Sequence, residues 1–405
     1  MLAERSPVAT IERCAPVRRT PTPACFPDSV ARSAMTERSH MMHRSGMRRA
    51  ISRREFLRWA GMGVVGHALL GSSLIGCASK PADAAKYAAV EELVVKLRNT
   101  FDLPGVAVGL IRDNELVYAR GFGVRNLDTG EPMTETSVMA IASMSKTLTG
   151  AAIYQLVEAG KINLDDPFVK HVPYFEMEDE RYKDITIRHI LAHTSGLPAV
   201  SDADFYHEWD DPWTDDGAAE RLVRSLAKGV RLLQPPGGAS FLYSDVGYDI
   251  LAALIHQVTG ELFEDYQQRH IFKPLQMKNS TFLMSEVKPQ SLAAAHVGAG
   301  ARLTVWDRYP YARQHAPSCC LFTNIVDLSR WVMANLNQGM YRKRIMKPET
   351  HAQMWESLYD RPWDWSDGYN SGWFVGTEEK AWVGPVRLVF TGGAMPGAST
   401  YAMLF

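Results

Sequence analysis

Ser143 and Lys146 form a Ser-x-x-Lys pattern, which combines a nucleophile with a neighbouring base. The pattern lies in the segment I-A-S-M-S-K-T, residues 141–147, at the start of a helical periodicity over residues 143–158. Residues three apart on a helix lie on one face, with Cβ atoms about 5–6 Å apart. The two side chains can therefore share a site in which the serine hydroxyl attacks a carbonyl and a base takes its proton.

The start of a helix suits this pair. Its partial positive charge disfavours a nearby cation and so lowers the pKa of Lys146, which helps the amine to act as a base. The same end presents backbone N–H groups to an oxyanion. Ser145 fits less well, because the residue three positions later is Leu148. Alone, the pattern would indicate only a capping serine and a surface lysine, since Ser-x-x-Lys occurs by chance in many chains.

Three further motifs follow along the chain. The segment L-A-H-T-S-G-L-P covers residues 191–198, and Tyr243-Ser244-Asp245 follows P-P-G at residues 235–237. Thr391-Gly392-Gly393 lies on a late β-rich run. Together with Ser-x-x-Lys, this set resembles the serine hydrolases of the penicillin-recognising fold, and within them the class C β-lactamase and esterase branch. The resemblance covers about residues 88–405, and it is supported by segments 104–108, 160–167 and 274–277.

The resemblance implies a role for each matching residue. Ser143 would be the acylated nucleophile, and Lys146 and the phenol of Tyr243 would exchange its proton and later activate water. The backbone N–H groups of Ser143 and Gly393 would form the oxyanion hole, a source of several kcal/mol of barrier lowering in such sites. The expected substrate-binding residues are Asp245, Phe390, Thr391 and Gly392. The resemblance implies neither a metal ion nor a cofactor.

The function implied is that of a cell-envelope serine hydrolase. It would cleave small-molecule esters, or less readily amides, through an acyl-enzyme on Ser143. A second interpretation is a β-lactamase or a D-aminopeptidase-type activity. A third, of a different class, is a binding relative in which Ser143 is present but catalysis is too weak to matter.

The sequence departs from the usual family pattern at three places. Asp245 stands where the family usually has Asn, and a carboxylate near Lys146 would raise the pKa of the lysine and oppose a tyrosinate at Tyr243. Phe390 stands where Lys or His usually precedes Thr-Gly, so we expect a neutral ester rather than an anionic β-lactam, with the ring suited to an acyl or alkoxy chain. The sequence ends one strand after the third motif, where family members continue with another strand and a long helix, so we expect a domain truncated at its C-terminus.

Two other pairs of residues could carry chemistry. His189 and His193 lie four apart, which would allow a metal pair, but no carboxylate-bearing third ligand accompanies them. We therefore expect His193 to be a structural hydrogen-bonding residue. Cys319 and Cys320 are adjacent, and because vicinal disulfides are strained we expect two reduced or buried thiols.

Two aromatic clusters flank the motifs. We expect packing together with a solvated acidic loop, and the alternative is the rim of an acyl pocket. The first cluster contains Phe205, Tyr206, Trp209 and Trp213, with acidic residues at 208, 210, 211, 215 and 216. The second contains Tyr359, Trp363, Trp365, Tyr369 and Trp373.

The sequence of the N-terminal part indicates a targeting signal. Residues 52–57, S-R-R-E-F-L, match a twin-arginine export pattern, and a weakly apolar run of 18 residues with five glycines follows at residues 59–76. That run is short and glycine-rich for a transmembrane anchor. L-I-G-C, ending at Cys77, is typical of a lipoprotein processing box, so we expect cleavage before Cys77 and lipid attachment to its thiol, with the enzyme tethered to a membrane. We expect the protein to be periplasmic or bound to the cell envelope.

The distribution of charged residues also separates the N-terminal segment from the rest of the chain. Residues 1–58 hold 12 arginines and no lysine, whereas residues 77–405 carry 32 basic and 40 acidic side chains, a net formal charge of −8. An acidic body argues against nucleic acid as a partner. We expect a disordered leader or misplaced start at residues 1–46, a signal segment at 47–77, a linker at 78–86 and one hydrolase domain at 87–405.

The body alternates between two kinds of pattern. A helical stripe covers residues 87–101, and β-rich runs at 105–111 and 115–121 are joined by Asp113-Asn114, a hairpin signal. Helical patterns such as 247–259 and 327–337 fill the middle, and β-rich runs return at 371–376, 386–391 and 398–405. This order predicts an α+β domain, in which one antiparallel sheet from both terminal segments is flanked by helices and carries an inserted helical lobe.

Overall fold

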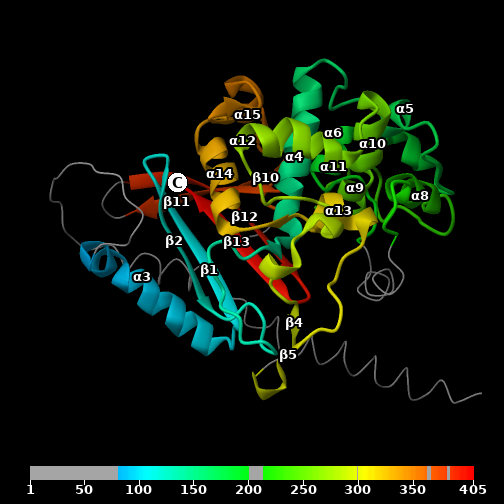
Figure 1. The fold of residues 1–405 in the computed structure, drawn as a ribbon. Coiled ribbons are helices and arrows are strands. Elements are labelled where there is room, and N and C mark those ends of the chain that lie inside the picture. Colours follow the sequence, from blue (N-terminus) through cyan, green and yellow to red (C-terminus); the bar gives the residue numbers. More distant parts are fainter. Residues whose placement is uncertain (1–80, 200–212, 299, 363–365, 381–383) are drawn as a thin grey trace, which may run out of the picture. The chain divides into compact units, whose positions relative to one another are not determined.

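The computed structural model describes residues 81–199, 213–298, 300–362, 366–380 and 384–405, all within the compact unit Leu57–Phe405 (Figure 1). The predicted leader, signal segment and Cys77 lie outside the described residues. Within the described part of the chain, no helix is both long enough and apolar enough to cross a bilayer. The structure is a mixed α+β fold, as the sequence predicts.

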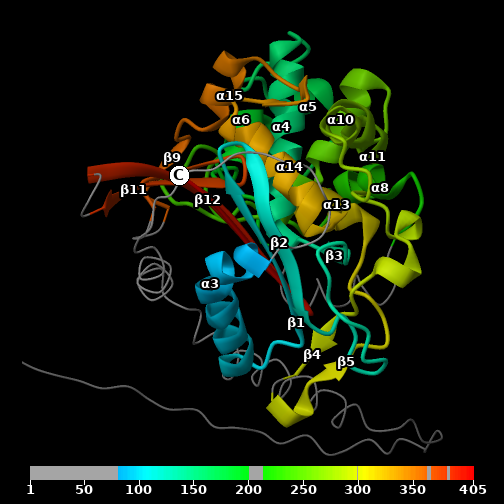
Figure 2. The same ribbon diagram turned by 60° about the vertical axis from the view of Figure 1, so that its left-hand side comes forward.

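The first described elements are a helix and a hairpin. Helix α3 covers Pro81–Thr100, strand β1 covers Gly105–Arg112 and strand β2 covers Glu115–Gly123. Asp113 and Asn114 join the strands with φ angles of 51° and 61°, which is the backbone of a two-residue hairpin turn. α3 packs on β1, and Glu91 bonds Tyr118 and Arg120 of β2 (Figure 2). The predicted hairpin is confirmed, and the predicted helix is found but begins at Pro81, so residues 81–86 of the predicted linker are helical.

A helical lobe follows the hairpin. Its centre is α4, Ser145–Glu158, which has eleven buried residues among its 14. Helices α10, Leu251–Thr259; α11, Phe263–Gln267; α13, Ala316–Cys319; and α15, Pro348–Met354, pack around α4 (Figure 1). α4 is therefore held from several sides, and it positions the Ser-x-x-Lys segment at its N-terminus.

The remaining elements are short, apart from α14. The helical ones are η2 (Ala142–Met144), α5 (Phe168–His171), η3 (Glu180–Asp184), α6 (Ile187–Leu191), α8 (Ala218–Ser225), α9 (Asp245–Asp249), η4 (Gln268–Phe272), α12 (Lys273–Leu275), η5 (Met284–Glu286), η6 (Pro289–Ser291), η7 (Gly300–Arg302), η8 (Arg313–His315) and α14 (Ile325–Leu336). Three two-stranded ladders pair β3 (Met139–Ala140) with β6 (Phe322–Thr323), β4 (His296–Val297) with β5 (Thr304–Val305), and β7 (Met340–Tyr341) with β8 (Lys343–Arg344).

The last strands form an antiparallel sheet in the order β13-β12-β11-β10-β9. Their bounds are β9 (Tyr359–Asp360), β10 (Gly368–Asn370), β11 (Trp373–Lys380), β12 (Gly384–Met395) and β13 (Ala398–Leu404). β11 pairs with β12 only as far as Phe374 opposite Phe390, while β13 pairs with β12 up to Met395. The segment 391–395 of β12 therefore extends beyond β11, and this segment carries the third motif.

One detail of the predicted sheet is wrong. The sequence predicts a single sheet from both terminal segments, but within the described residues β1–β2 and β9–β13 are two separate hydrogen-bonded sheets. Both sheets instead pack on α14, which contacts β1, β2 and β13. The apolar faces of the strands are thus buried on a common helix, without hydrogen bonds between the two sets.

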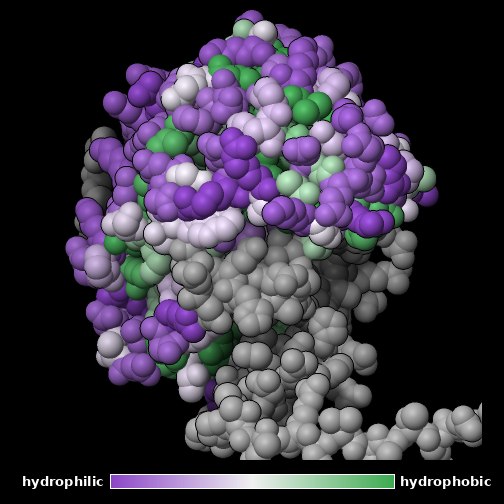
Figure 3. All heavy atoms as spheres, turned by 90° about the vertical axis from the view of Figure 1, so that its right-hand side faces the viewer, coloured by the Kyte–Doolittle hydropathy of each residue, from purple (hydrophilic) through white to green (hydrophobic). Residues whose placement is uncertain are grey.

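The largest cluster of buried apolar residues runs through the helical lobe and reaches β11, β12 and β13. Trp331 of α14 and Trp373 of β11 are fully buried, and their rings stack at 6.5 Å. Figure 3 views the lobe from the side of α8 and α10, where hydrophilic side chains predominate and apolar atoms are scattered. Apolar burial is the main driving force for packing of this kind.

Candidate active site

Ser143 lies in the one-turn helix η2, just before α4. It is partly exposed between buried neighbours, and the preceding residue, Ala142, has φ of +49°. A non-glycine residue in this left-handed region is strained, and such residues cluster at functional sites. Ser145 is fully buried and its hydroxyl accepts a hydrogen bond from Leu321 N at 3.0 Å. The structure therefore leaves Ser143 accessible and gives Ser145 a structural partner.

Lys146 is only 1% exposed and has three acceptors for its ammonium protons. Nζ lies 3.2 Å from Ser143 Oγ, 2.5 Å from Asp245 Oδ1 and 2.9 Å from the carbonyl oxygen of Ser318. An ammonium has three N–H donors and no acceptor. The geometry is thus that of a charged lysine held against Ser143.

The second motif is shaped by the cap of α9. Ser244 is the N-cap residue, and its hydroxyl accepts from Gly247 N at 3.2 Å and donates to Pro198 O at 2.8 Å. This arrangement puts Asp245 in the first turn of α9 and Tyr243 just before it. Lys146 Nζ lies 4.9 Å from the centroid of the Tyr243 ring. The structure thus brings together Ser143, Lys146, Tyr243 and Asp245.

The electrostatics favour the protonated forms of both candidate bases. Burial alone lowers the pKa of Lys146, but the charges of Asp245 and Tyr243 oppose this and the net pKa is raised. Burial raises the pKa of Tyr243, and Asp245 adds to the rise, while the charge of Lys146 and hydrogen bonds with Lys146 and Ser143 lower it in part. At neutral pH the resting site therefore holds an ammonium and a neutral phenol.

The third motif contacts Ser143 through its backbone. A Cβ atom on Gly393 would lie 2.6 Å from Ser143 N and 2.6 Å from Ile141 O, so only glycine fits here without a shift. On β13, opposite Gly393, the Thr400 hydroxyl donates to Ile141 O at 2.7 Å. The backbones of Gly393 and Ser143 are therefore adjacent, as an oxyanion hole made from their N–H groups requires.

Phe390 and Thr391 lie on opposite faces of β12, and both are buried. Phe390 is 2% exposed, and its ring stacks on Phe374 at 5.5 Å and on Tyr401 at 6.2 Å. The sequence predicts that this ring lines an acyl pocket, but in the structure it presents almost no surface to a substrate. Any influence of Phe390 acts through the aromatic cluster around it. Gly392, between the third-motif residues, is partly exposed.

The two histidines have partners of their own. His189 Nδ1 accepts from Thr186 N at 3.3 Å and so completes the cap of α6. His193 is buried directly behind Tyr243, with its ring centroid 4.3 Å from the phenol ring. Within the described residues, no three His, Cys, Asp or Glu side chains are grouped so that they could hold a metal ion.

The two cysteines are buried, and the described members of the aromatic clusters are buried or, at Trp213 and Tyr359, half-buried. Cys319 and Cys320 are free and buried, as predicted, with their sulfur atoms 3.3 Å apart. The hydrogen bond with Cys320 and burial raise the pKa of Cys319, which argues against a thiolate nucleophile. Tyr369 and Trp373 are core residues. Phe205, Tyr206, Trp209, Trp363 and Trp365 lie outside the described residues.

The carbonyl oxygen of Ser318 accepts a hydrogen bond from Lys146, and the sequence did not predict this contact. The carbonyl lies in α13, whose position is set in part by Asp249 Oδ1 accepting from Ser318 N at 3.1 Å. A backbone acceptor leaves no signature in residue type. The nearest available signal was position, since Ser318 immediately precedes the adjacent cysteines.

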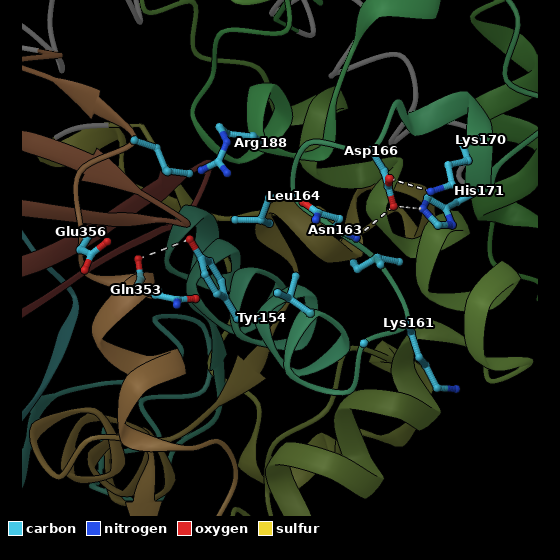
Figure 4. Close-up of a pocket in the computed structure, with 14 residues that line it drawn as sticks. Tyr154, Lys161, Asn163, Leu164, Asp166, Lys170, His171, Arg188, Gln353 and Glu356 are labelled. Atoms are coloured by element: carbon cyan, nitrogen blue, oxygen red, sulfur yellow. Dashed lines mark hydrogen bonds and ion pairs between the residues drawn. The ribbon is translucent and has the colours of Figure 1, made fainter.

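A polar cleft of about 910 Å³ lies elsewhere, at the far end of α4 (Figure 4). Tyr154 lines it, roughly 12 Å along the helix from Lys146 at 1.5 Å per residue. Its other walls include Asp166, which is paired with Lys170 and His171. The lining of the cleft contains no residue of the four motifs, so the cleft is separate from the candidate site at Ser143.

Comparisons with known proteins find similar sequences and similar folds. A family model described as "Beta-lactamase" matches residues 90–405. "Protein flp" of Staphylococcus aureus (strain MW2) is 29% identical over 303 residues, which is 75% of this chain and 57% of that protein. "Penicillin-binding protein 4" of Amycolatopsis lactamdurans is 28% identical over 287 residues, 68% of this chain and 72% of that one. The chain thus spans little more than half the length of Protein flp.

Solved structures share the fold. The octameric penicillin-binding protein homologue from Pyrococcus abyssi has a TM-score of 0.67 at 27% identity, and covers 79% of this chain and 70% of its own. FmtA from Staphylococcus aureus has a TM-score of 0.62 at 20% identity, covering 80% of this chain and 82% of its own, which is a likeness of fold.

Proposed function

The chain belongs to the beta-lactamase family and is a serine hydrolase, and we propose that it cleaves neutral esters through an acyl-enzyme on Ser143. The observation that carries this proposal is the contact of 3.2 Å between Ser143 Oγ and Lys146 Nζ beside the Gly393 backbone. A nucleophile, a proton carrier and two backbone N–H groups are what acyl transfer requires.

The reaction proceeds in two halves. Ser143 Oγ attacks the ester carbonyl, and its proton passes to Tyr243 or Lys146 after one of them has released a proton. The N–H groups of Ser143 and Gly393 stabilise the negative oxygen, and collapse of the intermediate expels the alkoxide, which takes the proton. Water then attacks the acyl-enzyme with the same groups in reverse, releasing the acid and restoring Ser143.

The proposed preference for an uncharged substrate rests on the negative charge around the site and on the lack of a cation at position 390. Asp245 places a carboxylate, 24% exposed, beside the nucleophile. The residue before Thr391 is a buried phenylalanine, which supplies no cation or hydrogen-bond donor to an anionic group. Desolvating the ring carboxylate of a β-lactam without a partner is expensive. The formal charge of −8 over residues 77–405 adds a bias against anions.

A paired kinetic assay tests the proposal. We expect kcat/KM for p-nitrophenyl butyrate to exceed that for the chromogenic cephalosporin nitrocefin, and both activities to be lost in Ser143→Ala. Ser145→Ala, a matched change at the buried neighbour, should retain the nucleophile. A higher kcat/KM for nitrocefin in the unmodified protein would contradict ester cleavage as the main activity.

Penicillin binding is the second candidate, and the match to "Penicillin-binding protein 4" favours it. In that case Ser143 would be acylated by a β-lactam and deacylated slowly. Stoichiometric labelling by a fluorescent penicillin, without ester turnover, would support this candidate over the first.

The location that we propose is the cell envelope. It rests on the S-R-R-E-F-L pattern and on L-I-G-C ending at Cys77 in the sequence. Cleavage before Cys77 and lipid attachment to its thiol would leave the hydrolase domain in water beside a membrane.

A further inference from the structure

His193 holds the backbone on both sides of Tyr243. Its carbonyl oxygen accepts from Leu242 N at 2.8 Å, and its Nδ1 accepts from Ser244 N at 3.1 Å. The side chain is 1% exposed, so no water replaces either bond. One residue thus binds the positions immediately before and after the phenol that faces the nucleophile.

These hydrogen bonds determine which of the two ring nitrogen atoms of His193 carries the proton. Nδ1 accepts from a backbone N–H, so the neutral imidazole carries its hydrogen on Nε2. Nε2 is 2.9 Å from the Tyr369 hydroxyl oxygen and donates to it. Burial, and then the charge of Lys146, hold the pKa of His193 well below its usual range, so the ring stays neutral.

The chain of hydrogen bonds continues in one direction away from the site. Tyr369 Oη also accepts from Gly372 N at 3.1 Å, so its own hydrogen goes to Tyr248 Oη, 3.3 Å away. Tyr248 then donates to Leu191 O at 2.9 Å. Each hydroxyl group has one hydrogen to donate, and each donates it to the next acceptor in the chain. The direction of every hydrogen bond in this buried network is therefore fixed.

The same imidazole supports the face of the phenol. Its centroid lies 4.3 Å from that of Tyr243, at an interplanar angle of 35°, and 5.0 Å from those of Tyr248 and Tyr369. Tyr243 in turn lies against the Lys146 ammonium. A shift of His193 would therefore move the ring that receives the proton of Ser143.

Backbone strain marks the same residues. His193 has φ of +56°, and Ser371, next to Gly372, has φ of +51°. Such conformations are unfavourable for non-glycine residues and persist only where the surroundings over-determine them. The network of hydrogen bonds provides that constraint.

We infer that His193, hydrogen-bonded to Tyr369, is a positioning residue that sets the phenol of Tyr243 for acyl transfer at Ser143. The inference rests on the proposed function, in which Tyr243 exchanges the proton of the nucleophile. His193 itself touches no substrate in this role.

The test compares Tyr369→Phe with Tyr154→Phe in the full-length protein. Both changes remove one buried hydroxyl and keep the ring, but Tyr154 bonds Asn370 and Gln353 at the far end of α4. We expect Tyr369→Phe to lower kcat for p-nitrophenyl butyrate by about 10-fold with KM nearly unchanged, because misplacement of a reacting group acts on the chemical step. Tyr154→Phe should lower the melting temperature by a similar amount and leave kcat unchanged.

Substitutions of His193 sharpen the test. We expect His193→Ala to lower kcat by about 100-fold, and His193→Asn to recover part of this loss, because its amide oxygen can still accept from Ser244 N. The rate of capture of Ser143 by a fluorophosphonate should follow the same order. Equal kcat in Tyr369→Phe and Tyr154→Phe, or no recovery in His193→Asn, would overturn the inference.

A spectroscopic measurement separates this inference from the proposed function. Long-range proton–nitrogen NMR of protein labelled with ¹⁵N-histidine, assigned through His193→Asn, should show His193 protonated on Nε2 alone. A proton on Nδ1 would overturn the inference whatever the activity. If the protein cleaves no ester yet shows this tautomer and the expected order of capture rates, the ester proposal fails and the positioning role stands.

Discussion

At the scale of single residues, the lysine beside the nucleophile is not a free base. Its Nζ has acceptors in Ser143, Asp245 and Ser318, and Asp245 is the closest at 2.5 Å. Acylation must therefore start from the minor fraction of molecules in which Lys146 or Tyr243 has lost a proton. This requirement predicts an activity that rises with pH.

Asp245→Asn should move that rise to lower pH. Asp245 raises the pKa of both Lys146 and Tyr243, so removing its charge lowers both values and increases the deprotonated fraction at neutral pH. A fall of about one pKa unit would raise kcat/KM at pH 7 roughly 10-fold. Profiles of kcat/KM against pH measure the shift, and Asp215→Asn, which removes an exposed carboxylate paired with Arg221, serves as the control. An unmoved profile with lower activity would assign Asp245 a positive role, such as a base.

Phe390→His should shift the preference toward cephalosporins. Phe390 is buried in its aromatic cluster, so the imidazole of the variant can offer its N–H to an anionic group beside Thr391 only after it leaves that cluster, which should cost about 1–3 kcal/mol of stability. We expect the ratio of kcat/KM for nitrocefin to that for p-nitrophenyl butyrate to rise. Phe374→His, at the cross-strand partner in the same cluster, controls for disruption of packing. An equal ratio in the two variants would show that position 390 has no special part in selectivity.

At the scale of elements, the contact between β12 and η2 brings together the two backbone N–H groups of the proposed oxyanion hole. Gly393→Ala should lower kcat by about 100-fold or more, comparable to loss of an oxyanion donor, because the new methyl group would push β12 away from Ser143 N. In Gly247→Ala the new Cβ would lie at an ordinary 3.5 Å from Ile190, so this control should retain activity. Esterase kinetics together with melting curves measure both variants. Full activity in Gly393→Ala would remove Gly393 from the oxyanion hole.

The elements that were predictable are those with a strong local pattern. The predicted helix at 247–259 is found as α9 and α10, and the runs near the end of the chain are β11, β12 and β13. Whether two sets of strands share hydrogen bonds depends on tertiary packing, so the single predicted sheet failed. The burial of Phe390 could have been inferred from its period-two relation to Leu388, since alternate residues of a strand share one face. The contacts made by the carbonyl of Ser318 and the N–H of Gly372 could not have been inferred from the sequence, because these backbone groups leave no trace in residue type.

At the scale of the whole molecule, the proposed targeting signal at residues 47–77 lies between an arginine-rich leader and an acidic hydrolase domain. Replacing Arg53 and Arg54 by Lys should retain the precursor in the cytoplasm, because the paired arginines are the signal for export. Cys77→Ala should abolish lipid attachment while the hydrolase domain stays active. Fractionation of cells and metabolic labelling with a fatty acid measure these effects. An unmodified protein that incorporates no label would contradict the lipid anchor.

In the proposed reaction a single serine, Ser143, carries the acyl group. Mass spectrometry of the protein treated with a fluorophosphonate, and of acyl-enzyme trapped with a slow ester, should find the adduct on the peptide that contains Ser143 and on no other. Ser145→Ala should be labelled like the unmodified protein, and Ser143→Ala should remain unlabelled. Labelling that survives Ser143→Ala, or an adduct on Ser145, would contradict the account.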